Sequence, residues 1–462
     1  MREAREGDEL YAEKTMVGCH FGLVLLLMLF CSGCSGEPEP LRICVDADAA
    51  GTSASSCESV MQSFLDTIAM MGGPSDVVLE IVPRSGVERE TAIDRIRTEI
   101  MSGKGPDVFI VPCGDGYLTS EPSLFPVPEK TLEAGIFLPL DEYIENAQFM
   151  DWDKQTAVVM EAGRNEYGQQ IIPLTYTLPL TFYRAFETEG IKPGTDTTWQ
   201  DMLADESGVL KTAATWDHVN FDAGETYFVS SEDNYLEYIL GDFADYKTDT
   251  LLFTEEELLQ RTTEVLELEK AYDAGEFDHV PAHYQTVIYT GFDYVPGGSV
   301  YVHNREGAKS YRGIGYDQAQ TMIPIYSDDG GVTASVTSFA AINANTKRPK
   351  DAFYILDVLM DLGHQQYFDL YEYWLAGHSS GIPVHEDLLS ENYPTGNCFM
   401  TDANYNEFVR VREQITHVRF RGGLAAEFDD MYAECKLADA AGEDIAPIVS
   451  RYYDTLKMMM AE

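Results

Sequence analysis

Three short apolar runs decide the fold: Leu41–Val45 (LRICV), Val77–Val82 (VVLEIV) and Asp107–Val111 (DVFIV). Between them, apolar residues recur at spacings of three and four, as at Ile96 and Ile100, which is typical of helices. Strands that alternate with helices through short loops pair in parallel and are joined by right-handed crossovers. The sequence therefore predicts an α/β fold in which a mostly parallel sheet is flanked by helices.

Further along, two segments predict long amphipathic helices. Thr254 and Glu257 form a capping box before an apolar face, and Gly275 is placed to end that helix. A second apolar face runs through residues 352–360. With 462 residues the chain is too long for one ordinary core and suits two lobes.

The N-terminus indicates an exported protein. Phe21–Phe30 (FGLVLLLMLF) is an apolar run of ten residues, which suits a signal peptide and is too short to span a bilayer. The following Cys31-Ser-Gly-Cys34 resembles a bacterial lipobox, which predicts a signal peptide over residues 1–33, an acylated Cys34 and a polar tether over residues 34–40. Since five acids and three bases precede the run, an uncleaved hydrophobic anchor is the alternative.

Charge and cysteine content restrict the partners and the compartment. The net charge of −47 repels phosphate backbones, which excludes a nucleic-acid partner, and it disfavours direct adsorption to anionic lipid. Five of the eight cysteines follow Cys34, at irregular spacing and without a disulfide framework. We expect these five to be free thiols, most of them buried: Cys44, Cys57, Cys113, Cys398 and Cys435.

No motif for catalysis or metal binding is present. Asp46, Asp48 and Gly51 suggest a calcium loop, but Ala50 and Cys57 stand where such a loop requires ligands. The histidines lack zinc-like spacing, and neither a G-x-S-x-G nor a phosphate-binding glycine motif occurs. The sequence therefore predicts a non-enzyme without metal or cofactor.

Several motifs, taken in order, resemble the extracellular solute-binding proteins of carbohydrate ABC transporters, the maltose-binding-like group. They are Ser102–Val108 (SGKGPDV), Leu138–Tyr143 (LPLDEY), Asn165–Gly168 (NEYG), Ile172–Pro173, Leu180–Tyr183 (LTFY), Thr198–Asp201 (TWQD), Phe339–Ile342 (FAAI) and Pro349–Ala352 (PKDA). The resemblance implies the two-lobed type II periplasmic-binding-protein fold, in which a hinge joins two α/β lobes. We expect the first lobe to contain residues 41–137 with 285–331, and the second to contain residues 138–284 with 332–462.

The resemblance also implies a function. We expect a monomer, lipid-anchored on the outer face of the cell membrane, that captures a sugar or oligosaccharide by hinge closure and delivers it to ABC permease subunits. Two alternatives remain: a secreted hydrolase that uses cleft carboxylates, and a surface receptor of the same fold with no role in transport.

Candidate ligand-binding residues follow from position, resemblance and chemistry. Asp46 and Asp48 follow the first strand, and Asp115 and Tyr117 follow the third, where open α/β sheets bind ligands. A sugar site also needs aromatic platforms beside polar acceptors, and the chain holds 27 Tyr, 22 Phe and 4 Trp. The resemblance adds Tyr176, Asn234 and Tyr235, and Trp374 is a candidate on chemical grounds.

The lipobox generates a first prediction. Mass spectrometry of the native protein is expected to show a diacylglyceryl group on Cys34 as residue one of the mature chain, because a short apolar run ends in Ser-Gly-Cys. Recovery of a mature chain that retains residues before Cys34 would favour the uncleaved anchor instead.

Overall fold

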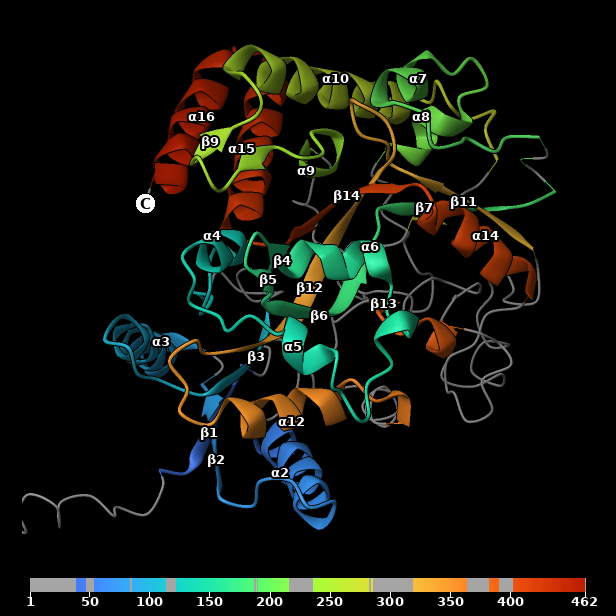
Figure 1. Cartoon of the computed structure of the whole chain (residues 1–462). Coiled ribbons are helices and arrows are strands. Elements are labelled where there is room, and N and C mark those ends of the chain that lie inside the picture. The colour runs from blue at the N-terminus through green and yellow to red at the C-terminus, as the bar shows by residue number, and fades with distance from the viewer. Residues whose placement is uncertain are drawn as a thin grey trace, which may run out of the picture. The chain divides into compact units, whose positions relative to one another are not determined.

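The first sheet is built on the three predicted strands. In the computed structural model, β1 (Leu41–Asp46) pairs in parallel with β2 (Val77–Val82) and with β3 (Val108–Pro112). The helices α2 (Ala54–Met70) and α3 (Gly86–Met101) connect them, so the predicted β-α-β-α-β start is confirmed (Figure 1). The structure describes residues 39–46, 54–83, 85–113, 122–186, 188, 190–215, 236–281, 284–285, 319–363, 382–389 and 402–461.

One long strand extends this sheet. β12 (Val332–Ile342) lies between β3 and β6 (Ile171–Thr177) through its C-terminal half and pairs antiparallel with both. Its N-terminal half pairs in parallel with β14 (Ile415–Phe420), and the two-residue β13 (Ile382–Pro383) completes the other edge beside β6. Nearly every residue of β12 is buried, as expected for a strand covered on both faces.

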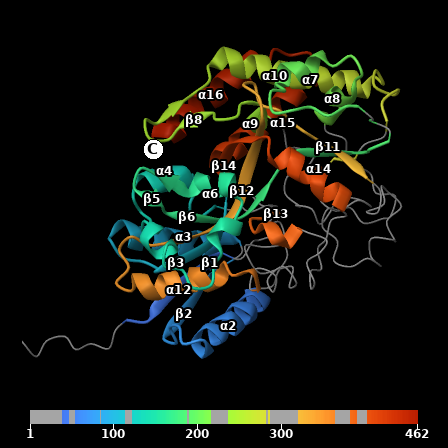
Figure 2. The same ribbon diagram turned by 45° about the vertical axis from the view of Figure 1, so that its right-hand side comes forward.

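A second, smaller sheet is antiparallel and has three strands. β7 (Leu180–Arg184) lies between β10 (Tyr284–Gln285) and β11 (Gln320–Pro324). Figures 1 and 2 show α10, α15 and α16 grouped beyond β14, away from α2 and α12. The helices that accompany this sheet are α7 (Trp199–Ala204), α8 (Val209–Ala213), α9 (Leu236–Ile239), α10 (Glu255–Asp273), α14 (Asp402–Arg412), α15 (Gly423–Ala440) and α16 (Ala446–Ala461).

Short elements fill the remainder of the described chain. None of the helices within the described ranges has the length and apolar character of a membrane span. The remaining elements are α4 (Pro128–Glu133), α5 (Asp141–Ile144), η1 (Trp152–Lys154), α6 (Ala157–Met160), η2 (Glu161–Gly163), β4 (Arg164–Asn165), β5 (Gly168–Gln169), β8 (Ala244–Asp245), β9 (Thr250–Leu251), α12 (Pro349–Leu359) and η4 (Glu386–Leu389).

Local signals at helix ends and at cysteines are confirmed where the structure describes them. The capping box of Thr254 and Glu257 starts α10, and Gly275 follows its end with φ of 78°. Cys44, Cys113 and Cys435 are free and buried, whereas the side chains of Cys57 and Cys398 lie outside the described residues.

The strand pairing differs from the expected lobe boundaries. Residues 138–284 were expected in the second lobe, but β6 is hydrogen-bonded to β12 within the sheet that contains β1, β2 and β3. Residues 320–324 were expected in the first lobe, but β11 pairs with β7 in the smaller sheet. The C-terminal half of β12 was expected in the second lobe and instead pairs with β3. These differences arise because long-range hydrogen bonding, not local sequence, assigns a strand to a sheet.

A buried ion pair fastens β1 to α3. Arg89 donates from Nη1 to Oδ1 of Asp46 at 2.7 Å and from Nη2 to Oδ2 at 2.8 Å, and Asp46 is 1% exposed. Arg89 also donates to the carbonyl groups of Pro83 and Pro122, at 3.1 and 3.0 Å. Burial raises the pKa of Asp46, and Arg89 opposes that shift. The expectation that Asp46 binds a ligand is therefore wrong, since both of its carboxylate oxygens serve the fold.

This pair generates a stability prediction. Arg89→Ala leaves a buried carboxylate without its counter-charge and is expected to lower the free energy of unfolding by about 3–5 kcal/mol in chemical denaturation. Arg95→Ala is the control on the same helix, because Arg95 is half exposed and pairs with Glu80 and Glu99 at the surface. That change should cost less than about 1 kcal/mol. Equal losses in the two variants would contradict a special role for the buried pair.

Candidate functional site

The strand ends expected to bind the ligand meet at one edge of the first sheet. β1 and β3 run in parallel, with Val45 opposite Ile110, so their carboxyl ends lie side by side. Open α/β sheets bind ligands at such an edge. The candidates expected beyond these ends lie outside the described residues, as do the aromatic candidates further along the chain: Asp48, Asp115, Tyr117, Asn234, Tyr235 and Trp374. Cys34 also lies outside them.

Tyr176 is, with Asp46, one of the two predicted ligand residues that the structure describes. It lies next to the last residue of β6, opposite Ile382 of β13, and its side chain is fully buried. Burial raises the pKa of Tyr176 to about 12, and Arg412 and Thr156 oppose that shift. Within the described residues the hydroxyl makes no hydrogen bond of good geometry. A buried hydroxyl with unused hydrogen-bonding capacity is available to a polar partner.

Arg412 brings a second unused donor to the same place. Its Nη2 lies 3.4 Å from Oε1 of Glu386, so the pair links α14 to η4. Its Nη1 is buried and has no hydrogen-bond partner among the residues that the structure describes. Sequence analysis did not select Arg412 or Glu386, because an arginine at the end of an amphipathic helix does not indicate a binding site until its partners are known.

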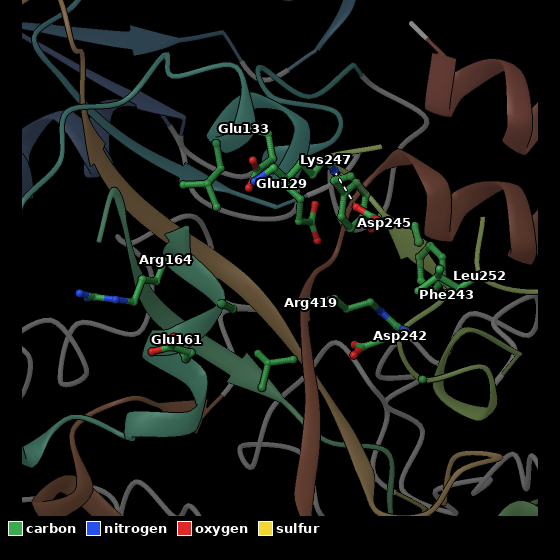
Figure 3. Close-up of a pocket in the computed structure, with 16 residues that line it drawn as sticks. Glu129, Glu133, Glu161, Arg164, Asp242, Phe243, Asp245, Lys247, Leu252 and Arg419 are labelled. Carbon is green, nitrogen blue, oxygen red and sulfur yellow. Dashed lines mark hydrogen bonds between the residues drawn. The ribbon is translucent and has the colours of Figure 1, made fainter. Parts of the chain in front are cut away.

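A separate pocket of about 460 Å³ lies between α4 and the segment around β8 (Figure 3). β14 contributes Val418 and Arg419, and the η2–β4 segment contributes Glu161 and Arg164. Figure 3 shows Glu129 and Arg419 entering it from α4 and β14. The pocket holds both signs of charge and the rings of Phe243 and Tyr246, so it has room and polar groups for a small polar molecule.

Arg419, which lines this pocket, belongs to a cluster of buried charges beside it. Glu237 is 2% exposed and pairs with Arg419 at 3.2 Å and with Arg421 at 3.5 Å. Arg421 also reaches Asp429 at 3.3 Å. The Arg419 guanidinium lies 4.7 Å from the centre of the Tyr238 ring, close enough for a cation–π contact.

The two predicted ligand residues that the structure describes, Asp46 and Tyr176, do not line the pocket. The sequence did carry a signal for it. Residues 415–421 read ITHVRFR, and since strand side chains alternate between faces, His417, Arg419 and Arg421 share one face. Charged residues on one face of a strand that is otherwise apolar indicate a buried polar cluster.

Comparison with known proteins identifies the fold. No family model matches the sequence, and no curated protein matches it. Among solved structures, the chain is similar to an extracellular solute-binding protein family 1 member from Alicyclobacillus acidocaldarius, with a TM-score of 0.54, 14% identity and coverage of 92% of this chain and 100% of that one.

Two further solved structures are also similar to this chain. One is the sugar-binding protein MalE from Xanthomonas citri, with a TM-score of 0.53, 12% identity, and coverage of 91% of this chain and 97% of that one. The other is a periplasmic oligogalacturonide binding protein from Yersinia enterocolitica, with a TM-score of 0.53, 11% identity, and coverage of 91% and 99%. The chain has the two-lobed type II periplasmic-binding-protein fold of the extracellular solute-binding proteins.

Proposed function

We propose that this protein captures a sugar or oligosaccharide outside the cell and delivers it to an ABC importer by closing its two lobes around it. The fold carries this proposal, because it is shared over more than nine-tenths of the chain with proteins named for binding sugars and oligogalacturonides. The parallel strands β1 and β3 support it, since their paired carboxyl ends form the kind of edge at which α/β sheets bind ligands.

The proposed site combines strand-end acids with aromatic and amide side chains. Asp115 and Tyr117 follow β3, Asp48 follows β1, and Tyr176 would contribute its buried hydroxyl from the end of β6. Asn234, Tyr235 and Trp374 complete the proposed set, in which aromatic rings stack on sugar C–H faces. Asp46 is not part of the proposed site, because both of its carboxylate oxygens accept hydrogen bonds from Arg89.

The protein is proposed to act without catalysis, as a monomer held to the outer face of the membrane through Cys34. Screening a panel of neutral and acidic oligosaccharides by thermal shift, followed by calorimetry on the hits, tests capture. Chromatography of the same mixtures tests for hydrolysis. Binding with unchanged sugar supports capture, whereas shortened products would favour the secreted hydrolase. If the protein binds a sugar whose uptake does not depend on an ABC permease, the surface receptor would be favoured.

A carboxylate that binds sugar hydroxyls generates the next prediction. Asp115→Ala is expected to weaken binding by roughly tenfold to a hundredfold, since a charged hydrogen bond contributes about 1.5–3 kcal/mol. Its melting temperature should change little. Asp153→Ala, which removes an exposed acid elsewhere, is the control and should retain wild-type affinity. An unchanged dissociation constant with a lowered melting temperature would assign Asp115 to the fold.

Tyr176 allows a test that separates an effect on affinity from an effect on stability. Tyr176→Phe removes a buried hydroxyl that makes no hydrogen bond of good geometry among the described residues, so the free energy of unfolding should change little. If the hydroxyl meets the bound sugar, the dissociation constant should rise about threefold to tenfold, which corresponds to a neutral hydrogen bond of about 0.5–1.5 kcal/mol. Calorimetry and a melting curve on the same sample measure both. Unchanged affinity would remove Tyr176 from the site.

A further inference from the structure

The pocket between α4 and the segment around β8 is not explained by the proposed sugar site. Its described lining residues come from α4, from the η2–β4 segment, from residues 241–252 and from β14 (Figure 3). None of these described residues belongs to the proposed sugar-binding set. A volume of about 460 Å³ is in the range of pockets that hold small organic molecules.

The basic residues of the lining are each paired with an acid that is not among the described lining residues. The pairs, with the distance between their charged atoms, are Arg164–Asp141 at 2.5 Å, Lys247–Glu166 at 3.0 Å and Arg419–Glu237 at 3.2 Å. The positive charges of the pocket are therefore already compensated, and an anionic ligand would have to compete with these acids.

The acidic residues of the lining mostly lack such partners. Asp242 lies 3.3 Å from His417. The others have no basic group within salt-bridge distance among the residues that the structure describes: Glu129, Glu133, Glu161 and Asp245. The pocket therefore presents uncompensated negative charge and favours a cation.

Glu129 is the buried member of this acidic set. It is 9% exposed, and its Oε1 accepts a hydrogen bond from the backbone N–H of Phe420 at 2.9 Å, which fixes the orientation of the carboxyl group. Its Oε2 makes no hydrogen bond within the described ranges, and Figure 3 shows the carboxyl group projecting from α4 into the pocket. A buried carboxylate oxygen without a donor is costly, and a donor on a bound ligand would satisfy it.

The protonation of Glu129 is compatible with a cationic ligand. Burial raises the pKa of Glu129 to about 7. A positive charge placed beside the carboxyl group would lower this pKa again, because an opposite charge favours the ionised form.

The spacing of the acids suits an extended cation rather than a metal ion. Among the described residues, no three His, Cys, Asp or Glu side chains lie close enough together to hold one metal ion. Glu129 and Glu133 lie one turn apart on α4, whereas Glu161 belongs to η2 and Asp245 to β8. Carboxylates on separate elements match a ligand whose positive charges are also separated.

Apolar side chains complete the lining. Leu132 and Phe243 are buried, and the ring of Tyr246 lies beside them in the lining. Leu252 is 58% exposed, so an alkyl chain that covers it would remove apolar surface from water. Aromatic rings also attract ammonium groups.

We propose that this pocket is a second binding site, which takes a small organic dication in which an alkyl chain joins two amino groups. One ammonium group binds the carboxylate of Glu129, the more exposed acids of the lining hold the other, and the alkyl chain contacts Leu252. This inference goes beyond the proposed function and does not rest on it, because it uses no residue of the proposed sugar site.

Titration calorimetry at pH 8 tests the site with 1,4-diaminobutane. Glu129 is then mostly ionised, and alkyl ammonium groups, which resemble the lysine side chain, remain charged. Salt at about 0.15 M screens general attraction to the net charge of −47. One diamine should bind each chain. 1-Aminobutane, which loses one ion pair, should bind roughly threefold more weakly or worse. 1,4-Butanediol, which is uncharged, should not bind.

Matched variants locate the binding. Glu129→Gln keeps an oxygen for the Phe420 N–H but loses the charge, so it should fold and bind the diamine roughly tenfold to a hundredfold more weakly. Asp153→Asn removes an exposed acid outside the pocket and should keep wild-type affinity. Melting curves check that each variant is folded. If Glu129→Gln fails to fold, Glu133→Gln replaces it, with an expected loss of roughly threefold.

Three results would each overturn the proposal: no binding of the diamine to the wild type, equal binding of the diol, or equal affinity of Glu129→Gln and Asp153→Asn for the diamine. Sugar binding is measured on the same samples and should be unchanged in Glu129→Gln. A failure of diamine binding therefore leaves the proposed function intact, and a failure of sugar binding leaves the second site intact.

Discussion

Strand β12 determines how the two halves of the molecule are connected. Its first residues, Val332–Val336, pair with β14, and its last, Ser338–Ile342, lie hydrogen-bonded between β3 and β6. A single strand with partners on both sides at its C-terminal half cannot shift register without exposing its buried side chains on both faces. The positions of the first sheet, of β14 and of the pocket beside it therefore depend on this one register.

Local patterns predicted the elements well and their assignment to lobes poorly. The strands β1, β2 and β3 follow the apolar runs closely, and Thr254, Glu257 and Gly275 start and end α10 as expected, because these signals are local. The lobe boundaries depended on which strands pair, and β6 and β12 pair although they are far apart in sequence. Asp46 was misassigned for the same reason: an acid after a strand resembles a ligand residue until its partner Arg89 is known. The charge cluster beside the pocket could not be predicted, because Glu237 meets Arg419 and Arg421 from a distant segment.

Because basic residues are few, each described ion pair matters more to the stability of the fold. The chain has 31 bases against 78 acids, and several bases join elements distant in sequence. Arg348 at the start of α12 holds Asp76 before β2, and Arg261 of α10 holds Asp328 before β12. Arg410 of α14 reaches the carbonyl groups of Pro193 and Met322. Most acidic residues therefore have no basic partner, and repulsion among their charges opposes folding. Dissolved salt screens this repulsion.

The C-terminal residues complete contacts made by early parts of the chain. Val108 of β3 pairs with Ile342 of β12, β12 pairs with β14 at residues 415–420, and Lys130 binds the carbonyl of Met460. Contacts between such distant residues form slowly, since long loops have to close first. The first sheet and the contact of α4 with α16 therefore remain incomplete until nearly the whole chain has been synthesised.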